Sequence, residues 1–215
     1  MLAHVNRLAC LKVLFEHPSS SVGEVAGSLR VPVNQASMFL RALQARGLIS
    51  AQRNSRWVRY VPFPDPLVPD SKPILSALRR ALINEKRSGA DVRHTLTSFT
   101  HPRRLVILIC LYEKRAVSAE ELARFTRISL PALSRHLNKL AARQLVRYDK
   151  QEWRLIPPPN DLSKTLLHLT QSDGQESMKE KVSQRKTCKS VSAEVSKEQK
   201  AAFDQPLDPI RKRKG

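Results

Sequence analysis

The sequence predicts a mainly α-helical protein with small β-hairpins, built from two copies of one unit and followed by a disordered C-terminal tail. Three observations predict this fold class. The chain repeats itself at a fixed spacing, leucines recur at helical intervals in each copy, and a short alternating segment follows the last helix of each copy.

The repeat aligns residues 4–50 with residues 101–147 without a gap, at the offset of 97 residues that separates His4 from His101. Roughly a third of the paired residues are identical, and one loop adjustment also pairs Trp57 with Trp153. The repeat therefore predicts a first domain over 1–62, a Pro-rich connector with a linking helix over 63–100, a second domain with a C-terminal helix over 101–170, and a tail over 171–215.

Helical spacing predicts the first and third helices of each copy. The first has apolar residues at Leu8, Leu11, Leu14 and Phe15, matched by Leu105, Leu108, Leu111 and Tyr112. The third is predicted over 33–46 and 130–143, with a buried stripe of Ala36, Leu40 and Leu43, or of Leu133, Leu137 and Leu140. Between them, Ser118 and Glu121 match a capping box and predict the start of a short second helix.

Alternation then predicts two strands in each copy, over 48–53 and 56–61 and over 145–149 and 152–156. Gly47 suits the left-handed residue that ends a helix, and Gln144 has to take that position in the second copy. Three helices and a hairpin are the order of a winged helix-turn-helix domain. A fourth helix follows each hairpin, with apolar stripes beginning at Ile74 and at Leu162.

The charge favours a polyanionic partner. The chain has 38 Lys and Arg against 19 Asp and Glu, a net charge of +19 and a pI near 10.6. Residues 1–170 alone have 27 basic and 12 acidic side chains, so the excess is not confined to the tail. The tail is rich in Ser, Lys, Gln and Glu, which predicts disorder. Its basic end at 211–214 suits nonspecific phosphate affinity, a targeting signal or a solvated terminus.

The three cysteines predict neither a metal site nor a disulfide. Cys10 and Cys110 lie in apolar helical patterns and Cys188 lies in the polar tail, so no metal-ligand spacing occurs. No apolar run is long enough to cross a membrane. We expect a cytoplasmic, nucleoid-associated protein without a cofactor or metal.

The second copy resembles an ArsR-type winged-helix repressor through the segment Val117 to Ala123, the run Ser134-Arg135-His136-Leu137, and Leu145-Val146. The first copy shows the same frame, but Met38 and Phe39 replace the Arg-His pair, and Leu130 stands where the family usually has a polar residue. The family's Cys-containing metal-sensing sequence is absent. The resemblance implies DNA binding as a dimer, which here means either a homodimer or an internal pseudo-dimer, with no effector identified.

The outward face of each third helix is the candidate for reading bases, because an α-helix fits the major groove. The base-reading candidates are Asn34, Gln35, Ser37, Arg41, Ser129, Ser134, Arg135 and Asn138. The phosphate candidates lie on the two predicted hairpins, which we call the wings, and on the third helix of the second copy. They are Arg53, Arg56, Arg59, His136, Lys139, Arg147, Lys150 and Arg154. His136 also suits packing at the helix base, and Trp57 and Trp153 are expected to pack in the core.

These patterns predict a sequence-specific transcriptional regulator that binds double-stranded DNA. Two alternatives stay open: a replication initiator or nucleoid-organising protein, and a winged-helix scaffold for protein interactions. We expect no enzymatic activity, because the chain lacks a Gly-rich phosphate loop, a nucleophile elbow, a zinc motif and a carboxylate pair.

Overall fold

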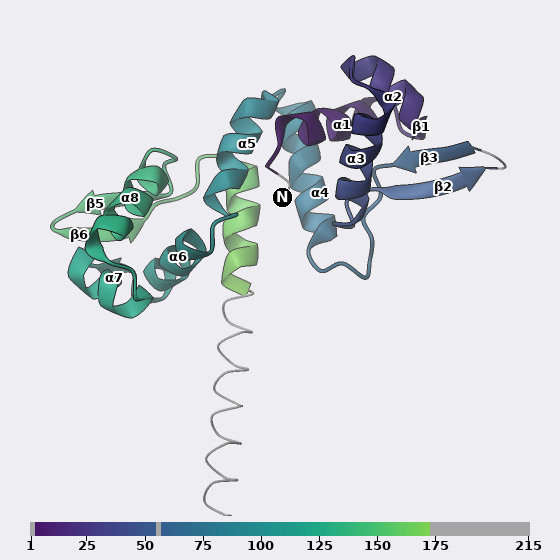
Figure 1. Ribbon diagram of the computed structural model, residues 1–215. Coiled ribbons are helices and arrows are strands. Elements are labelled where there is room, and N and C mark those ends of the chain that lie inside the picture. The colour runs from purple at the N-terminus through teal and green to yellow at the C-terminus, as the bar shows by residue number, and fades with distance from the viewer. Residues whose placement is uncertain (1–2, 55–56, 173–215) are drawn as a thin grey trace, which may run out of the picture. The chain divides into compact units, whose positions relative to one another are not determined.

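The computed structural model describes residues 3–54 and 57–172, which are mainly helical with two small antiparallel sheets (Figure 1). We call the described residues up to 61 the first segment, and its elements are α1 (Val5–Glu16), β1 (Ser20–Ser21), α2 (Val22–Leu29), α3 (Val33–Gln44), β2 (Ser50–Asn54) and β3 (Trp57–Val61). We call residues 99–156 the second segment, and its elements are α6 (Pro102–Lys114), β4 (Ala116–Val117), α7 (Ala119–Thr126), α8 (Leu130–Ala141), β5 (Val146–Asp149) and β6 (Glu152–Leu155). The mainly helical fold class with small hairpins is confirmed, and one order of elements occurs twice.

The turn between the second and third helices has the same geometry in both segments. Arg30 and Arg127 follow α2 and α7 with left-handed φ angles of 53° and 55°. At the other end of α7, the Glu121 amide donates to Ser118 Oγ at 3.2 Å, which confirms the predicted capping box. Ser21 and Glu24 form the equivalent box at α2. These ends fix where each third helix starts.

Each third helix packs its predicted stripe into a core. The six stripe residues are all buried: Ala36, Leu40, Leu43, Leu133, Leu137 and Leu140. The five leucines pack with residues of α1 in one core cluster and with residues of α6 in the other. Both helices end two residues earlier than predicted, and the left-handed residues Gly47 (φ 64°) and Gln144 (φ 54°) follow them as expected.

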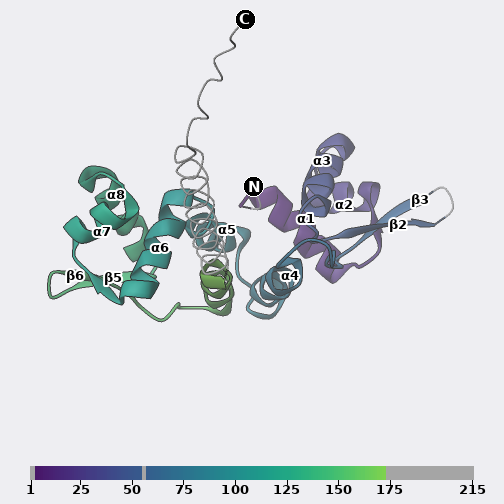
Figure 2. The ribbon, with the colours of Figure 1, turned by 90° about the horizontal axis from the view of Figure 1, so that it is seen from below.

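A short strand before the second helix completes each sheet, and the sequence did not predict it. The strand orders are β1-β3-β2 and β4-β6-β5, so β3 and β6 are the central strands. In Figures 1 and 2 the β2–β3 hairpin extends beyond the helices of its own segment. The two-residue strands β1 and β4 therefore attach each hairpin to the start of α2 or α7.

The pairing of these strands shows that the predicted match of Trp57 with Trp153 is wrong. Ser20 in β1 lies opposite Tyr60, and Val117, its counterpart in β4, lies opposite Trp153. Tyr60 is therefore the counterpart of Trp153. The strands of the first hairpin are five residues long and those of the second are four, so the first wing is longer at its tip.

The two tryptophans consequently differ in burial. Trp57 lies near the tip of the longer hairpin and is 60% exposed, which contradicts its expected core position. Trp153 is half-buried and packs against the second core, as expected. Inward-facing positions are set by strand register, and a tip beyond the helices has no core to pack against.

The connector contains more helix than predicted. The predicted stripe lies in α4 (Ser71–Arg79) and in the π-helical segment η1 (Arg80–Asn84), whereas α5 (Gly89–Ser98) was not predicted. The predicted fourth helix after the second wing covers residues 161–172. Its Leu162 and Leu166 belong to the same core cluster as the α1 and α4 leucines. The predicted domain bounds stay a prediction, and the tail beyond residue 172 lies outside the described residues.

Two further observations concern the remaining sequence predictions. Cys10 and Cys110 are buried free thiols, and burial raises the pKa of Cys10 to about 11. Cys188 lies outside the described residues. Within the described ranges, none of the helices combines the length and the apolar character needed to span a bilayer.

Candidate nucleic-acid interface

The outward face of α8 is polar and accessible. Ser129, Ser134, Arg135, Asn138 and Lys139 are all exposed, on the side opposite the buried leucine stripe. Arg135 Nε donates to the Pro131 carbonyl oxygen at 3.2 Å. That bond lays the side chain along its own helix and uses one of the five guanidinium N–H groups. The structure thus places these candidates where they were predicted, and base contact stays a prediction.

The outward face of α3 is polar but less basic. Asn34, Gln35 and Arg41 are exposed and Ser37 is half-buried. The Gln35 amide donates to Asn34 Oδ1 at 2.8 Å, which orients the Asn34 side chain near the start of the helix. Two apolar side chains lie on the same surface: Val33 is 59% exposed and Met38 is 67% exposed. The two third helices therefore present different chemistry.

The ring of His136, on α8, packs against the ring of His101. Its ring centroid is 4.7 Å from that of His101, whose Nδ1 accepts from the Arg103 amide at the start of α6. His136 is half-buried, and its Nδ1 is buried without a hydrogen-bond partner. Burial, and then the charges of His101 and Arg104, lower the pKa of His136. This environment favours the packing alternative over a phosphate contact.

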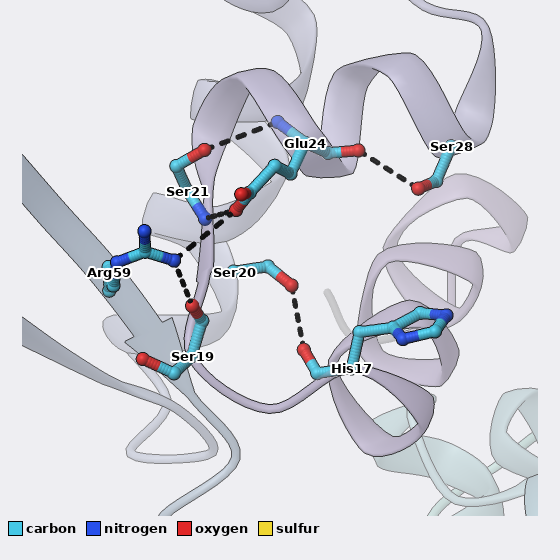
Figure 3. A network of polar contacts seen from close by, with 7 residues as sticks. All are labelled: His17, Ser19, Ser20, Ser21, Glu24, Ser28 and Arg59. Carbon is cyan, nitrogen blue, oxygen red and sulfur yellow. Dashed lines mark hydrogen bonds and ion pairs between the residues drawn. The ribbon is translucent and has the colours of Figure 1, made fainter.

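The first wing holds one of its predicted phosphate ligands in internal contacts (Figure 3). Arg59 Nη1 donates to the Ser19 carbonyl oxygen at 2.8 Å and lies 3.6 Å from Glu24 Oε2. Hydrogen bonds from Ser21, together with Arg59, lower the pKa of Glu24. Arg59 thus joins β3 to the start of α2. Arg53 is exposed, and Arg56 lies outside the described residues.

The second wing keeps two of its basic residues accessible. Arg147 is exposed on β5, and Lys150 is exposed in the tight turn, where Lys150 and Gln151 have φ angles of 50° and 64°. Arg154 lies directly opposite Arg147 on β6 and is half-buried. Its Nη2 donates to Glu152 Oε2 at 2.9 Å. The carboxylate offsets the repulsion between the two opposed arginines.

Two arginines that the sequence interpretation did not select connect α6 and α8 to α5. Arg104 is 8% exposed; its Nε donates to the Ser98 carbonyl oxygen at 3.2 Å and its Nη2 donates to that of Thr97. Arg143 Nε donates to the His94 carbonyl oxygen at 3.0 Å. Their identity with Arg7 and Arg46 in the repeat was the signal that could have selected them.

The second segment also matches a known family. Residues 99–149 match the family model described as a helix-turn-helix domain. This part of the chain is therefore similar to a helix-turn-helix domain. It comprises α6, β4, α7, α8 and β5, so it includes the exposed face of α8 and Arg147. No curated protein matches the chain significantly.

A helix-turn-helix domain indicates a DNA-binding regulator, and the partner it indicates is double-stranded DNA. Across residues 3–54 and 57–172, no group of three or more His, Cys, Asp and Glu side chains is placed to hold a metal ion. The candidate interface thus consists of α8 and its wing, and the exposed residues of these elements are polar or cationic apart from Leu130, Pro131 and Tyr148.

Proposed function

We propose that this protein is a sequence-specific transcriptional regulator that reads the major groove of DNA with α8 and α3, one from each of two tandem winged helix-turn-helix domains. The observation that supports it best is the exposed polar face of α8 within the helix-turn-helix domain. A helix with exposed polar side chains fits the major groove, where each base pair presents its own pattern of hydrogen-bond donors and acceptors.

In the second of these domains, α8 supplies the base contacts. Arg135 makes a bidentate contact to guanine, and Asn138 suits adenine because its amide both donates and accepts. Leu130, 46% exposed at the first position of α8, suits contact with a thymine methyl group. Leu130 would then make an apolar contact at a position where ArsR-type repressors usually have a polar residue.

The second wing supplies phosphate contacts through Arg147 and Lys150, which fix the register of α8 along the duplex. The net charge of +19 adds long-range attraction to a polyanion. The first segment reads a second half-site with Asn34, Gln35 and Arg41, as an internal pseudo-dimer or within a homodimer. We expect the chain to have no catalytic role and to need no cofactor or metal.

Selection of bound sequences from random duplex DNA tests the proposal, and it reports a preferred site and the spacing of half-sites. Arg135→Ala should reduce the preference at one position by about 1–3 kcal/mol. Arg147→Ala is the matched comparison, because loss of a phosphate contact weakens all sequences alike. Binding without any sequence preference would contradict the proposal and favour the replication-initiator or nucleoid alternative.

One observation favours the second candidate, a scaffold for protein interactions. Val33 and Met38 expose apolar surface on α3, where a DNA reader is expected to be polar. A titration of salt separates the two, because phosphate neutralisation makes affinity for DNA fall steeply as salt rises. A chain that acts only as a scaffold would bind duplex DNA weakly at physiological salt and without sequence preference.

A further inference from the structure

A cationic groove of about 760 Å³ lies between α5 and α8. We call it the α5–α8 groove. The lining residues are Arg93, His94 and Thr97 of α5, Arg104 of α6, Arg135, Asn138, Lys139 and Ala142 of α8, and Arg143 directly after α8. Helical spacing explains this set, because one face of α8 and one face of α5 line opposite walls.

The charge of this groove has one sign. Five of its lining residues are Arg or Lys, one is His, and the lining that the structure describes includes no carboxylate. Burial, followed by the charge of Arg143, lowers the pKa of Arg104. Like charges that line one groove repel one another, and an anion that enters the groove relieves this repulsion.

The position of α5 is fixed by contacts on both of its faces. Val92 and Leu96 are buried in the first core cluster, and the carbonyl groups at its C-terminal end accept hydrogen bonds from Arg104 and Arg143. Arg143 Nη2 also donates to Thr97 Oγ1 at 3.1 Å. These bonds satisfy the C-terminal carbonyls of α5 and hold its outer face against α8.

We propose that the α5–α8 groove binds the phosphodiester backbone of the same duplex that α8 reads. This inference rests on the proposed function and extends it to α5, which begins before the helix-turn-helix domain. Arg135, Asn138 and Lys139 belong both to the groove and to the exposed face of α8, so a duplex on that face lies next to the groove.

Arg93 is the residue that this inference adds to the interface. It is exposed on α5, and it was not among the residues selected from the sequence. A cation on a second element beside the recognition helix contacts phosphate and reads no base, so it contributes affinity and register but no sequence preference. Its loss should therefore have a different signature from the loss of Arg135.

The test measures binding of the full chain to its selected duplex by fluorescence anisotropy at several salt concentrations. Arg93→Gln should weaken binding about tenfold at low salt and reduce the slope of log K against log salt by roughly 0.9, with the sequence preference unchanged. Arg93→Lys keeps the charge and should bind like wild type. Lys72→Gln removes an exposed charge on α4 outside the groove and is the matched control.

Two outcomes overturn the inference while leaving the proposed function intact. In the first, Arg93→Gln has the affinity and salt slope of Lys72→Gln. In the second, wild type binds inorganic pyrophosphate through Arg93 while the DNA salt slope does not depend on Arg93, which assigns the groove to a free anion. A wild-type chain that binds no duplex overturns the proposed function and this inference together.

Discussion

The rings of His101 and His136 lie with their centroids 4.7 Å apart, and the equivalent positions of the first segment hold His4 and Phe39, 5.4 Å apart. In each segment the residue before the first helix thus packs against the third helix. The pair joins the start of one element to the element that carries the base-reading candidates. In the second segment both members are histidines, and in the first only His4 is.

The lowered pKa of His136 predicts that acid destabilises the second segment. Its pKa in the folded protein is below the ordinary value of about 6.5, so the unfolded chain binds more protons. The stability that neutral His136 contributes is therefore complete above about pH 6.5 and is lost as the pH falls through the lowered pKa. The loss stays below about 1.4 kcal/mol per pH unit, the limit for one proton.

The variant His136→Phe copies the residue of the first segment and should flatten this pH dependence. Urea unfolding of the full chain between pH 5 and pH 8 measures it, and His17→Gln, which removes an exposed imidazole, is the control. If His136→Phe and His17→Gln have the same pH profile as wild type, the proton does not bind at His136.

The capping box of α7 predicts a loss of stability on removal of one hydroxyl group. Ser118 Oγ accepts from the Glu121 amide, so Ser118→Ala should cost about 1 kcal/mol. Ser129 precedes α8 in the same way, but its side chain makes no capping hydrogen bond. Ser129→Ala should therefore cost much less in the same urea titration. Equal losses for the two variants would show that the hydroxyl contact is not the cause.

The third helices were predictable because each packs its leucines into one core, so the leucines recur in the sequence at the spacing of the buried positions of a helix. Leu40 and Leu137 occupy such positions, and the same pattern placed Arg135 and Asn138 outside. The helix α5 was missed because only Val92 and Leu96 mark its buried face, and its place depends on arginines distant in sequence. Local periodicity contains no information about such partners.

The pairing of the strands was a second feature that the sequence pattern did not predict. The two-residue strands β1 and β4 are too short to show alternation, yet they set the register that makes Tyr60 the counterpart of Trp153. The ion pairs of Arg59 with Glu24 and of Arg154 with Glu152 follow from that same pairing and from its neighbours. The position of an arginine on a predicted wing therefore does not show whether its side chain is available to bind phosphate.

The register also predicts that the two tryptophans respond differently to substitution. Trp57→Ala should change the free energy of unfolding by about 0.5 kcal/mol or less, because the ring is exposed at a hairpin tip. Trp153→Ala should cost at least about 2 kcal/mol, because that ring packs against the second core.

Fluorescence gives an independent measurement, since the chain has two tryptophans. Acrylamide should quench Trp57 in Trp153→Phe more strongly than it quenches Trp153 in Trp57→Phe. Equal quenching of the two single-tryptophan variants would contradict the register described here.

The end of α8 predicts a stabilising substitution. Gln144 has a φ of 54° where the first segment has Gly47 at 64°, and the amide of the following residue donates five residues back in both, from Leu145 to Leu140 and from Leu48 to Leu43. A side chain in this left-handed conformation costs about 1 kcal/mol or more that glycine avoids. Gln144→Gly should therefore raise the free energy of unfolding by about 0.5–1 kcal/mol, after the larger entropy of the unfolded chain is included.

Two comparisons make this result specific to the backbone angle. Ala142→Gly places glycine two residues earlier at a right-handed position, where it should destabilise by about 0.5–1 kcal/mol. Gly47→Ala should also destabilise, because a Cβ there would lie 2.7 Å from Val68 Cβ. If Gln144→Gly lowers stability as Ala142→Gly does, the side chain of Gln144 contributes more than its strained backbone costs, and the equivalence with Gly47 does not extend to energy.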